Sequence, residues 1–284
     1  IGGIATLVGT PPNLSFARII SIIFPEMTEI SFADWFIFAI PVTILIFAGA
    51  WLLLYLMYKP KESWENLKIN EFKNEYDELG KPKVEEKIVF VLFLILAFLW
   101  IFRSGFNIQS FVVPGWSKLF NAPSYINDGT VAIFIALLLF IIPSKSQKGE
   151  RIMNWETANR IPWNIVLLFG GGFALAQGFV DSGLSIWFGE QLAGLANVQP
   201  IVLTLANVTM MSLLTELTSN VATTEMILPI LAGLSMTIKI NPLLLMIPAT
   251  LAASLAFMLP VATPPNAIIF GTNRIKIKDM VKTG

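Results

Sequence analysis

The pentapeptide Gly9-Thr10-Pro11-Pro12-Asn13 near the start of the chain is nearly repeated as Ala262-Thr263-Pro264-Pro265-Asn266 near its end. Small and apolar residues precede each copy, and an apolar segment follows it. Two consecutive prolines cannot continue a helix, because each lacks an N–H and displaces the preceding residue from the α region. The repeat therefore predicts two membrane helices with unwound middles. The alternative, a pair of unrelated proline kinks, is disfavoured by the near-match of five residues.

The composition of the 284-residue chain is typical of a protein that lies in lipid. Hydrophobic residues make up 55% and charged residues only 13%, whereas soluble domains are about 25% charged. The formal net charge of zero argues against a nucleic-acid partner. Cysteine and histidine are absent, which excludes disulfides and chemistry that needs a thiol or an imidazole. We therefore expect an all-α polytopic membrane protein with no enzymatic activity and no organic cofactor.

Several apolar stretches approach the length that a membrane-spanning helix needs, about 20 residues. Residues 35–58 form an uncharged run of 24. The other apolar stretches are residues 88–102, 130–142, 163–188, 201–238 and 242–271, and the last three are interrupted by glycines, polar residues or prolines. The strongly charged segment 59–87 is expected to be a water-exposed loop.

Two residue types inside these stretches carry structural expectations. Gly170-Gly171-Gly172 interrupts the 163–188 stretch and is expected to allow close helix packing. Most of the eight tryptophans, among them Trp35, Trp163 and Trp187, are expected to anchor helices at the membrane interface.

The distribution of basic residues predicts a topology. Segments 59–87, 144–162 and 273–284 carry seven, four and four basic residues, fifteen of the nineteen, so we place all three on the cytoplasmic side. The chain then crosses outward from Trp163 and must return by Arg274. Residues 242–271 supply that one crossing, so residues 201–238 must enter and leave by the same outer face. The charge pattern therefore predicts a re-entrant hairpin.

The polar run Thr215–Glu225 lies at the tip of that hairpin, between two apolar arms. Polar sequence at membrane depth is costly unless it lines a cavity or is buried in protein. Hydroxyl, amide and released carbonyl oxygens suit a sodium ion, and the N-terminus of the returning arm suits an anion. Paired Gly/Pro-interrupted segments also point to the midplane site of a secondary transporter. The alternative is an ordinary loop with a Ser/Thr/Asn cap.

At these motifs the sequence resembles the divalent anion–sodium symporter family, whose members carry dicarboxylates, citrate or sulfate. The resemblance covers essentially the whole chain and rests on residues 2–13, Leu168–Gly172, Glu216–Asn220 and Pro260–Asn266. It implies a fold of two inverted repeats, each with a re-entrant hairpin and a broken helix. Residues 1–58 would then end the first repeat, residues 59–87 form a cytoplasmic loop, and residues 88–284 form the second repeat. We expect the chain to be a fragment that lacks the N-terminal part and the last helix.

The resemblance also implies roles for individual residues. One sodium site would use Thr215, Thr218, Asn220 and the Ala262 carbonyl, and a second would use the Gly9 carbonyl. Val221 departs from the family's Ser-Asn-Thr motif and removes a hydroxyl, so any side-chain hydrogen bond from that position is lost. The substrate would meet Ser219, Asn220, Val221, Thr263 and Pro264 on one side and Thr10 and Pro11 on the other.

The function that the resemblance implies is coupled uptake of sodium and a small dicarboxylate by alternating access, in a homodimer spanning a bacterial inner membrane. A sodium-independent carboxylate exchanger and a symporter of sulfate or another dianion are the alternatives. A channel is disfavoured because the sequence has no ring of acids and no filter motif. An acid–base pair is the alternative interpretation of Glu216 and Glu225, and we favour structural ion pairing or proton coupling for them.

Overall fold

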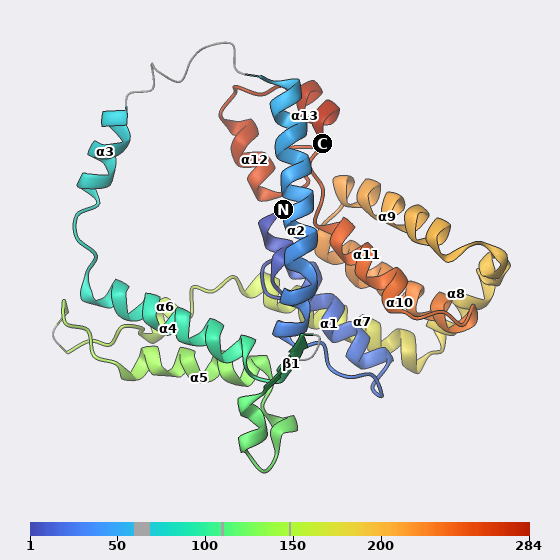
Figure 1. The fold of residues 1–284 in the computed structure, drawn as a ribbon, viewed down its shortest axis with the longest axis horizontal. Coiled ribbons are helices and arrows are strands. Elements are labelled where there is room, and N and C mark those ends of the chain that lie inside the picture. The colour runs from blue at the N-terminus through green and yellow to red at the C-terminus, as the bar shows by residue number, and fades with distance from the viewer. Residues whose placement is uncertain (60–68, 109–110, 148) are drawn as a thin grey trace. The chain divides into compact units, whose positions relative to one another are not determined.

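The computed structural model describes residues 1–59, 69–108, 111–147 and 149–284, which are mostly helical (Figure 1). They divide into two compact units. The first unit comprises residues 1–30, 35–50 and 162–284, and the second comprises residues 31–34 and 51–161. The predicted division at residues 58 and 87 stays a prediction, and residues 60–68 of the predicted charged loop lie outside the described residues.

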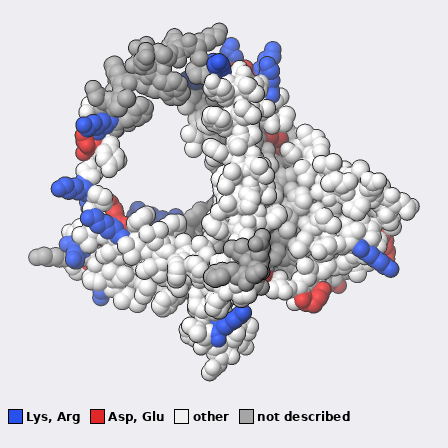
Figure 2. Space-filling model, in the orientation of Figure 1, with Lys and Arg blue, Asp and Glu red and all other residues white. Residues whose placement is uncertain are grey.

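Three helices of the described residues are long and apolar enough to cross a membrane, namely α2 (Phe32–Met57), α7 (Trp163–Asp181) and α9 (Pro200–Leu217). The apolar side chains along α2 are largely uncovered, and Leu45 and Leu56 are 73% and 71% exposed. On the face shown in Figure 2 the long helices carry few charged side chains. Such a surface is stable in lipid rather than in water, and the predicted all-α membrane fold is confirmed.

The second unit is built around α4 (Val84–Ile101) and α5 (Asp128–Ile141), which pack on each other. At one end of the pair, buried Arg103 forms an ion pair with Asp128, whose other carboxylate oxygen accepts from the Phe32 N–H at 3.0 Å. A short antiparallel pair, β1 (Gly105–Ile108) and β2 (Phe111–Pro114), follows α4. The sequence did not predict these strands.

The other end of this helix pair is held by Glu85, which precedes the apolar part of α4. Its carboxylate accepts from the backbone N–H groups of Lys145 and Ser146, each at 2.7 Å. The bond from the Ser146 N–H is the largest cause that lowers the pKa of Glu85 to about 2, and the hydroxyls of Ser146 and Ser144 also donate to this carboxylate and lower its pKa. The contact joins the end of segment 59–87 to the start of segment 144–162, and the cytoplasmic side assigned to both segments stays a prediction.

The first unit has α10 (Asn220–Thr237) at its centre. This helix packs against α8 (Leu184–Gln191), α1 (Pro11–Ile23), α11 (Leu243–Ala253) and α7. The α9 helix packs mainly on α11 rather than on α10, the other arm of the predicted hairpin. The described residues of the two units also form smaller elements: η1 (Gly2–Ala5), α3 (Ile69–Glu78), η3 (Trp116–Leu119), η4 (Pro123–Tyr125), α6 (Trp155–Ala158), η5 (Ala193–Asn197), α12 (Pro264–Gly271) and α13 (Ile277–Thr283).

The break expected at Gly170-Gly171-Gly172 was wrong, because α7 runs through all three glycines. The chain turns instead at Gly183, whose φ of 71° ends α7 and lets α8 begin. Glycine weakens a helix through its backbone freedom, but tertiary packing outweighs that cost here. The predicted close packing is confirmed at Gly172, where α7 approaches α10 so closely that a Cβ would overlap the Glu225 side chain.

Candidate functional site

Both copies of the Thr-Pro-Pro-Asn motif adopt the same local structure, in which an unwound segment leads into a helix. Thr10 (φ −146°, ψ 141°) and Thr263 (φ −144°, ψ 151°) are extended N-caps, and the two prolines take the first helical positions of α1 and α12. Proline suits those positions because its fixed φ is helical and its missing N–H would have no partner there. The predicted unwinding of both segments is confirmed.

The asparagine of each motif closes its own unwound segment. The Asn13 amide Nδ2 donates to the carbonyls of residues seven and ten positions earlier, Thr6 at 2.8 Å and Gly3 at 3.5 Å. The Asn266 amide donates at the same two offsets, to Leu259 and Ala256, each at 3.0 Å. Both side chains are buried. The carbonyls that unwinding leaves without helical partners are thus satisfied away from water.

The first unwound segment has two further supports. The indole of Trp35 is buried, packs against Phe16 and donates its N–H to the Ile4 carbonyl at 3.0 Å. Trp35 therefore supports the site, and its expected role as an interface anchor was wrong. A Cβ on Gly9 would overlap the Gly3 carbonyl oxygen, so only glycine lets the two ends of this segment approach so closely.

The second unwound segment is held by a carboxylate from the hairpin. Buried Glu216 accepts from the N–H groups of Met258 at 2.9 Å and Leu259 at 3.0 Å, one on each carboxylate oxygen. Within the described residues neither Glu216 nor Glu225 forms an ion pair, so the predicted ion pairing was wrong for both. Glu216 instead links the last turn of α9 directly to the loop that precedes Thr263.

The hairpin tip is much tighter than the predicted polar run. The α9 helix ends at Leu217 and α10 begins at Asn220, so only Thr218 and Ser219 lie between the two helices. Ser219 occupies the N-cap position, but its side chain makes no capping hydrogen bond. The first N–H groups of α10 are thus left for another acceptor. The ordinary capped loop, the alternative interpretation of the sequence, does not describe this turn.

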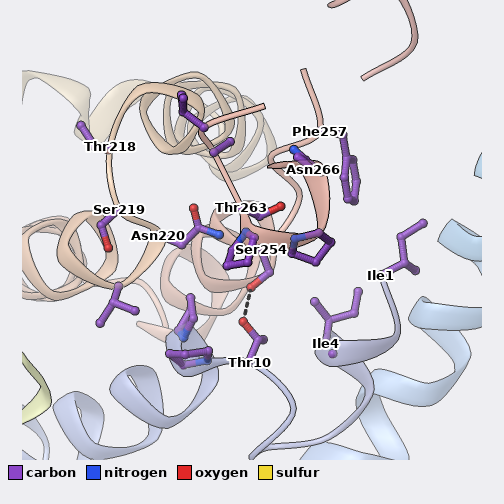
Figure 3. A pocket seen from close by; sticks show the side chains of 18 of the residues that line it. Ile1, Ile4, Thr10, Thr218, Ser219, Asn220, Ser254, Phe257, Thr263 and Asn266 are labelled. Atoms are coloured by element: carbon purple, nitrogen blue, oxygen red, sulfur yellow. Dashed lines mark hydrogen bonds between the residues drawn. The ribbon is translucent and has the colours of Figure 1, made fainter. Parts of the chain in front are cut away.

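The three motifs meet around one cavity of about 760 Å³ in the first unit (Figure 3). Ten of the eleven predicted site residues line it: Gly9, Thr10, Pro11, Thr218, Ser219, Asn220, Val221, Ala262, Thr263 and Pro264. Thr215 does not line the cavity. It is fully buried one turn before Thr218, and its hydroxyl donates to the Ser212 carbonyl at 3.1 Å.

Two residues of the hairpin tip that line this cavity carry side-chain oxygen atoms able to bind a cation. The Asn220 Oδ1 is buried and has no hydrogen-bond partner in the described structure. The Thr218 hydroxyl donates to the Leu214 carbonyl at 2.7 Å and also contacts the Thr223 hydroxyl. A hydroxyl that donates one hydrogen bond still has a lone pair to offer a cation. No lysine or arginine side chain is among the described residues that line the cavity.

Several residues that build the site were missed from the sequence. The Ser254 hydroxyl lies 3.2 Å from that of Thr10, which joins the two unwound segments across 244 positions of the chain (Figure 3). Phe257 also lines the cavity. Asn13 and Asn266 stood inside the repeated motif, so their identity was a usable signal. Nothing in the sequence singled out Ser254.

The family of the chain follows from comparison with known proteins. The family model described as the sodium:sulfate symporter transmembrane region matches residues 1–284. The chain belongs to the divalent anion–sodium symporter family. Membership in this family and the apolar helices make it a multi-pass protein of the cell membrane.

Two relatives within this symporter family illustrate the similarity. The sodium-dependent dicarboxylate transporter SdcS of Staphylococcus saprophyticus is 45% identical to the chain over 286 residues, and SdcS of Staphylococcus aureus is 46% identical. Each match covers 100% of this chain and 53% of the relative. The chain thus spans about half the length of the curated relatives it matches.

Proposed function

We propose that the protein containing this chain is a secondary active transporter that couples sodium uptake to the uptake of small dicarboxylates such as succinate. The observation that carries the proposal is that the described lining of the cavity has no positively charged side chain. This lining offers hydroxyl, amide and carbonyl groups instead. A dianion that leaves water without a cationic partner loses much of its hydration energy. Sodium ions bound beside the dianion would supply the missing positive charge.

The proposed ion sites use the oxygen atoms around the two unwound segments. The first sodium ion is assigned to Thr215, Thr218, Asn220 and the carbonyl of Ala262, and the second to the carbonyl of Gly9. Backbone carbonyls released by unwinding are the usual sodium ligands of such transporters. The unpartnered Asn220 Oδ1 supports this assignment, because a buried amide oxygen without a partner is costly.

The proposed substrate site lies between the two Thr-Pro motifs. The Thr10 and Thr263 hydroxyls and the first N–H groups of α10 are donors for carboxylate oxygens, with Pro11, Pro264, Ser219, Asn220 and Val221 completing the site. The starts of α1 and α12 contribute fewer N–H groups than other helices, because prolines occupy their first two positions. Their threonine hydroxyls therefore matter more for recognition.

A symporter of sulfate or another single-centred dianion is the second candidate, and the family description names sulfate. The relatives are named for dicarboxylates, and hydroxyl groups in two separate motifs suit a molecule with a carboxylate at each end. A sodium-independent carboxylate exchanger is the third candidate. We further propose a homodimer as the assembly, by analogy with the family.

Succinate uptake into proteoliposomes should depend steeply on sodium. Replacing sodium by choline on both sides of the membrane removes the cations that neutralise the dianion, so uptake is expected to fall to background. Uptake that is unchanged in choline but stimulated by internal succinate would instead identify an exchanger. Excess sulfate should leave succinate uptake largely intact, and strong competition by sulfate would favour the second candidate.

Val221→Thr should change the preference among dianions while leaving sodium coupling intact. The two side chains are nearly equal in volume, so the substitution chiefly adds a hydroxyl to the cavity lining. A hydrogen bond to a charged oxygen contributes about 1.5–3 kcal/mol, so the apparent affinity for the preferred dianion should improve roughly tenfold or more. Competition by succinate, citrate and sulfate measures the change. An unaltered preference at normal expression would show that residue 221 does not contact the anion.

A further inference from the structure

Glu225 is a buried carboxyl that the proposed binding site does not use. It lies in α10, is 3% exposed and does not line the cavity. Its Oε1 accepts a hydrogen bond from the hydroxyl of Ser15 in α1 at 3.0 Å. The two residues are 210 positions apart in the chain. The bond therefore connects the helix after the first Thr-Pro motif to the helix after the hairpin tip.

The third helix at this junction is α7, which contributes Gly172. A Cβ on Gly172 would overlap the carboxyl carbon and an oxygen of Glu225. The carboxyl thus occupies the space that a side chain on α7 would need. The three helices α1, α7 and α10 pack on one another, so we expect a displacement of the Glu225 carboxyl to act on α10 and, through Ser15, on α1.

The position of the junction along the two helices gives it a connection with the cavity. Ser15 is the fifth residue of α1 and Glu225 is the sixth residue of α10. With a rise of about 1.5 Å per residue, the bond lies about 6–8 Å behind the helix starts. Both helix starts, at Pro11 and Asn220, line the cavity. The bond is therefore close enough to fix how far apart these two starts are held.

We propose that Ser15 and Glu225 are positioning residues that set the gap between the starts of α1 and α10, while Gly172 leaves room for the Glu225 carboxyl. This gap in turn selects the chain length of the dicarboxylate that binds. This inference rests on the proposed function. The two carboxylates of a substrate must reach donors at the Thr10 motif and at the hairpin tip together. A wider gap favours a longer diacid, and a narrower gap favours a shorter one.

The test is competition of unlabelled malonate, succinate and glutarate against labelled succinate in proteoliposomes of the full-length protein. Gly172→Ala forces the carboxyl away from α7 and should shift the relative affinities of the three diacids. One methylene in a fitted pocket changes discrimination by about tenfold or more, so we expect a shift of that size. Ser15→Ala removes the bond and should also alter the ratios. Glu225→Gln should keep the wild-type ratios, because its amide oxygen still accepts from Ser15.

The double variant Gly172→Ala/Glu225→Ala separates positioning from general damage. Removing the Glu225 carboxyl makes room for the methyl on residue 172, so Gly172→Ala should have no further effect on the ratios in the Glu225→Ala background. Ratios that stay at wild-type values in both Gly172→Ala and Ser15→Ala would overturn the inference, even if uptake rates or protein amounts fell. Wild-type protein that transports none of the three diacids would overturn the proposed function and this inference together.

Discussion

Asn220→Ala should reduce sodium-dependent succinate uptake by about 100-fold or more. The side chain is assigned to both the sodium ion and the substrate, and each hydrogen bond or ligand to a charged group contributes about 1.5–3 kcal/mol. Two such losses multiply, which gives at least that factor. Because the Asn220 Oδ1 has no partner in the described structure, its removal should leave folding and protein amount close to wild type.

Asn207→Ala is the matched control for this substitution. Asn207, in α9 of the hairpin, is buried and, like Asn220, has an unpartnered Oδ1, but it does not line the cavity. Its amide donates to the Leu245 carbonyl at 2.9 Å, so the variant should lose some thermal stability and keep transport per folded molecule. The measurement is initial uptake rate normalised to reconstituted protein. A wild-type rate in Asn220→Ala would remove the hairpin tip from the mechanism.

Glu216→Ala should destabilise the protein and also weaken binding of both sodium and succinate. The substitution leaves the Met258 and Leu259 N–H groups without their acceptors. An unsatisfied buried group costs about 1–3 kcal/mol, and because both hydrogen bonds are only partly buried, the two losses together should cost roughly 2 kcal/mol, the lower end of the summed range. The same loss frees the segment that presents Ala262 and Thr263 to the cavity, so affinity should fall as well.

Glu216→Gln should have a smaller effect, because its single amide oxygen can accept from only one of the two N–H groups. Glu190→Ala is the control, since Glu190 is an exposed carboxylate of the same unit and its loss should change neither property. Thermal unfolding with and without sodium and succinate measures both effects. Wild-type unfolding temperatures in Glu216→Ala would show that the hydrogen bonds from Met258 and Leu259 to Glu216 do not stabilise the second unwound segment.

The parts of the fold that the sequence predicted are those with a strong local signal. The paired prolines fix two helix starts through backbone sterics, and the apolar runs fix the membrane helices through their length. The individual cavity residues came from the resemblance to the symporter family at these same motifs. Asn13 and Asn266 also belong to the repeated motif, although their role depends on hydrogen bonds to carbonyls up to ten residues away.

The parts that could not be predicted depend on contacts between distant segments. Nothing local to Trp35 distinguishes a tryptophan at the interface from one that donates to the Ile4 carbonyl. We expected a break at Gly170–Gly172, but α7 continues through these glycines because helix packing outweighs their low helix propensity. The chain turns at Gly183 instead, where the backbone is in the left-handed region. Glu225 and Ser15 are 210 positions apart, and a single sequence contains no information on such a pair.

Calorimetric titration of succinate into the purified full-length protein, in sodium chloride and in choline chloride, tests the central claim most directly. If sodium supplies the positive charge that the cavity lacks, succinate should bind about 100-fold more tightly in sodium, at the upper end of common coupling energies. By linkage, saturating succinate should tighten sodium binding by the same factor. Equal succinate affinity in the two salts would contradict the account.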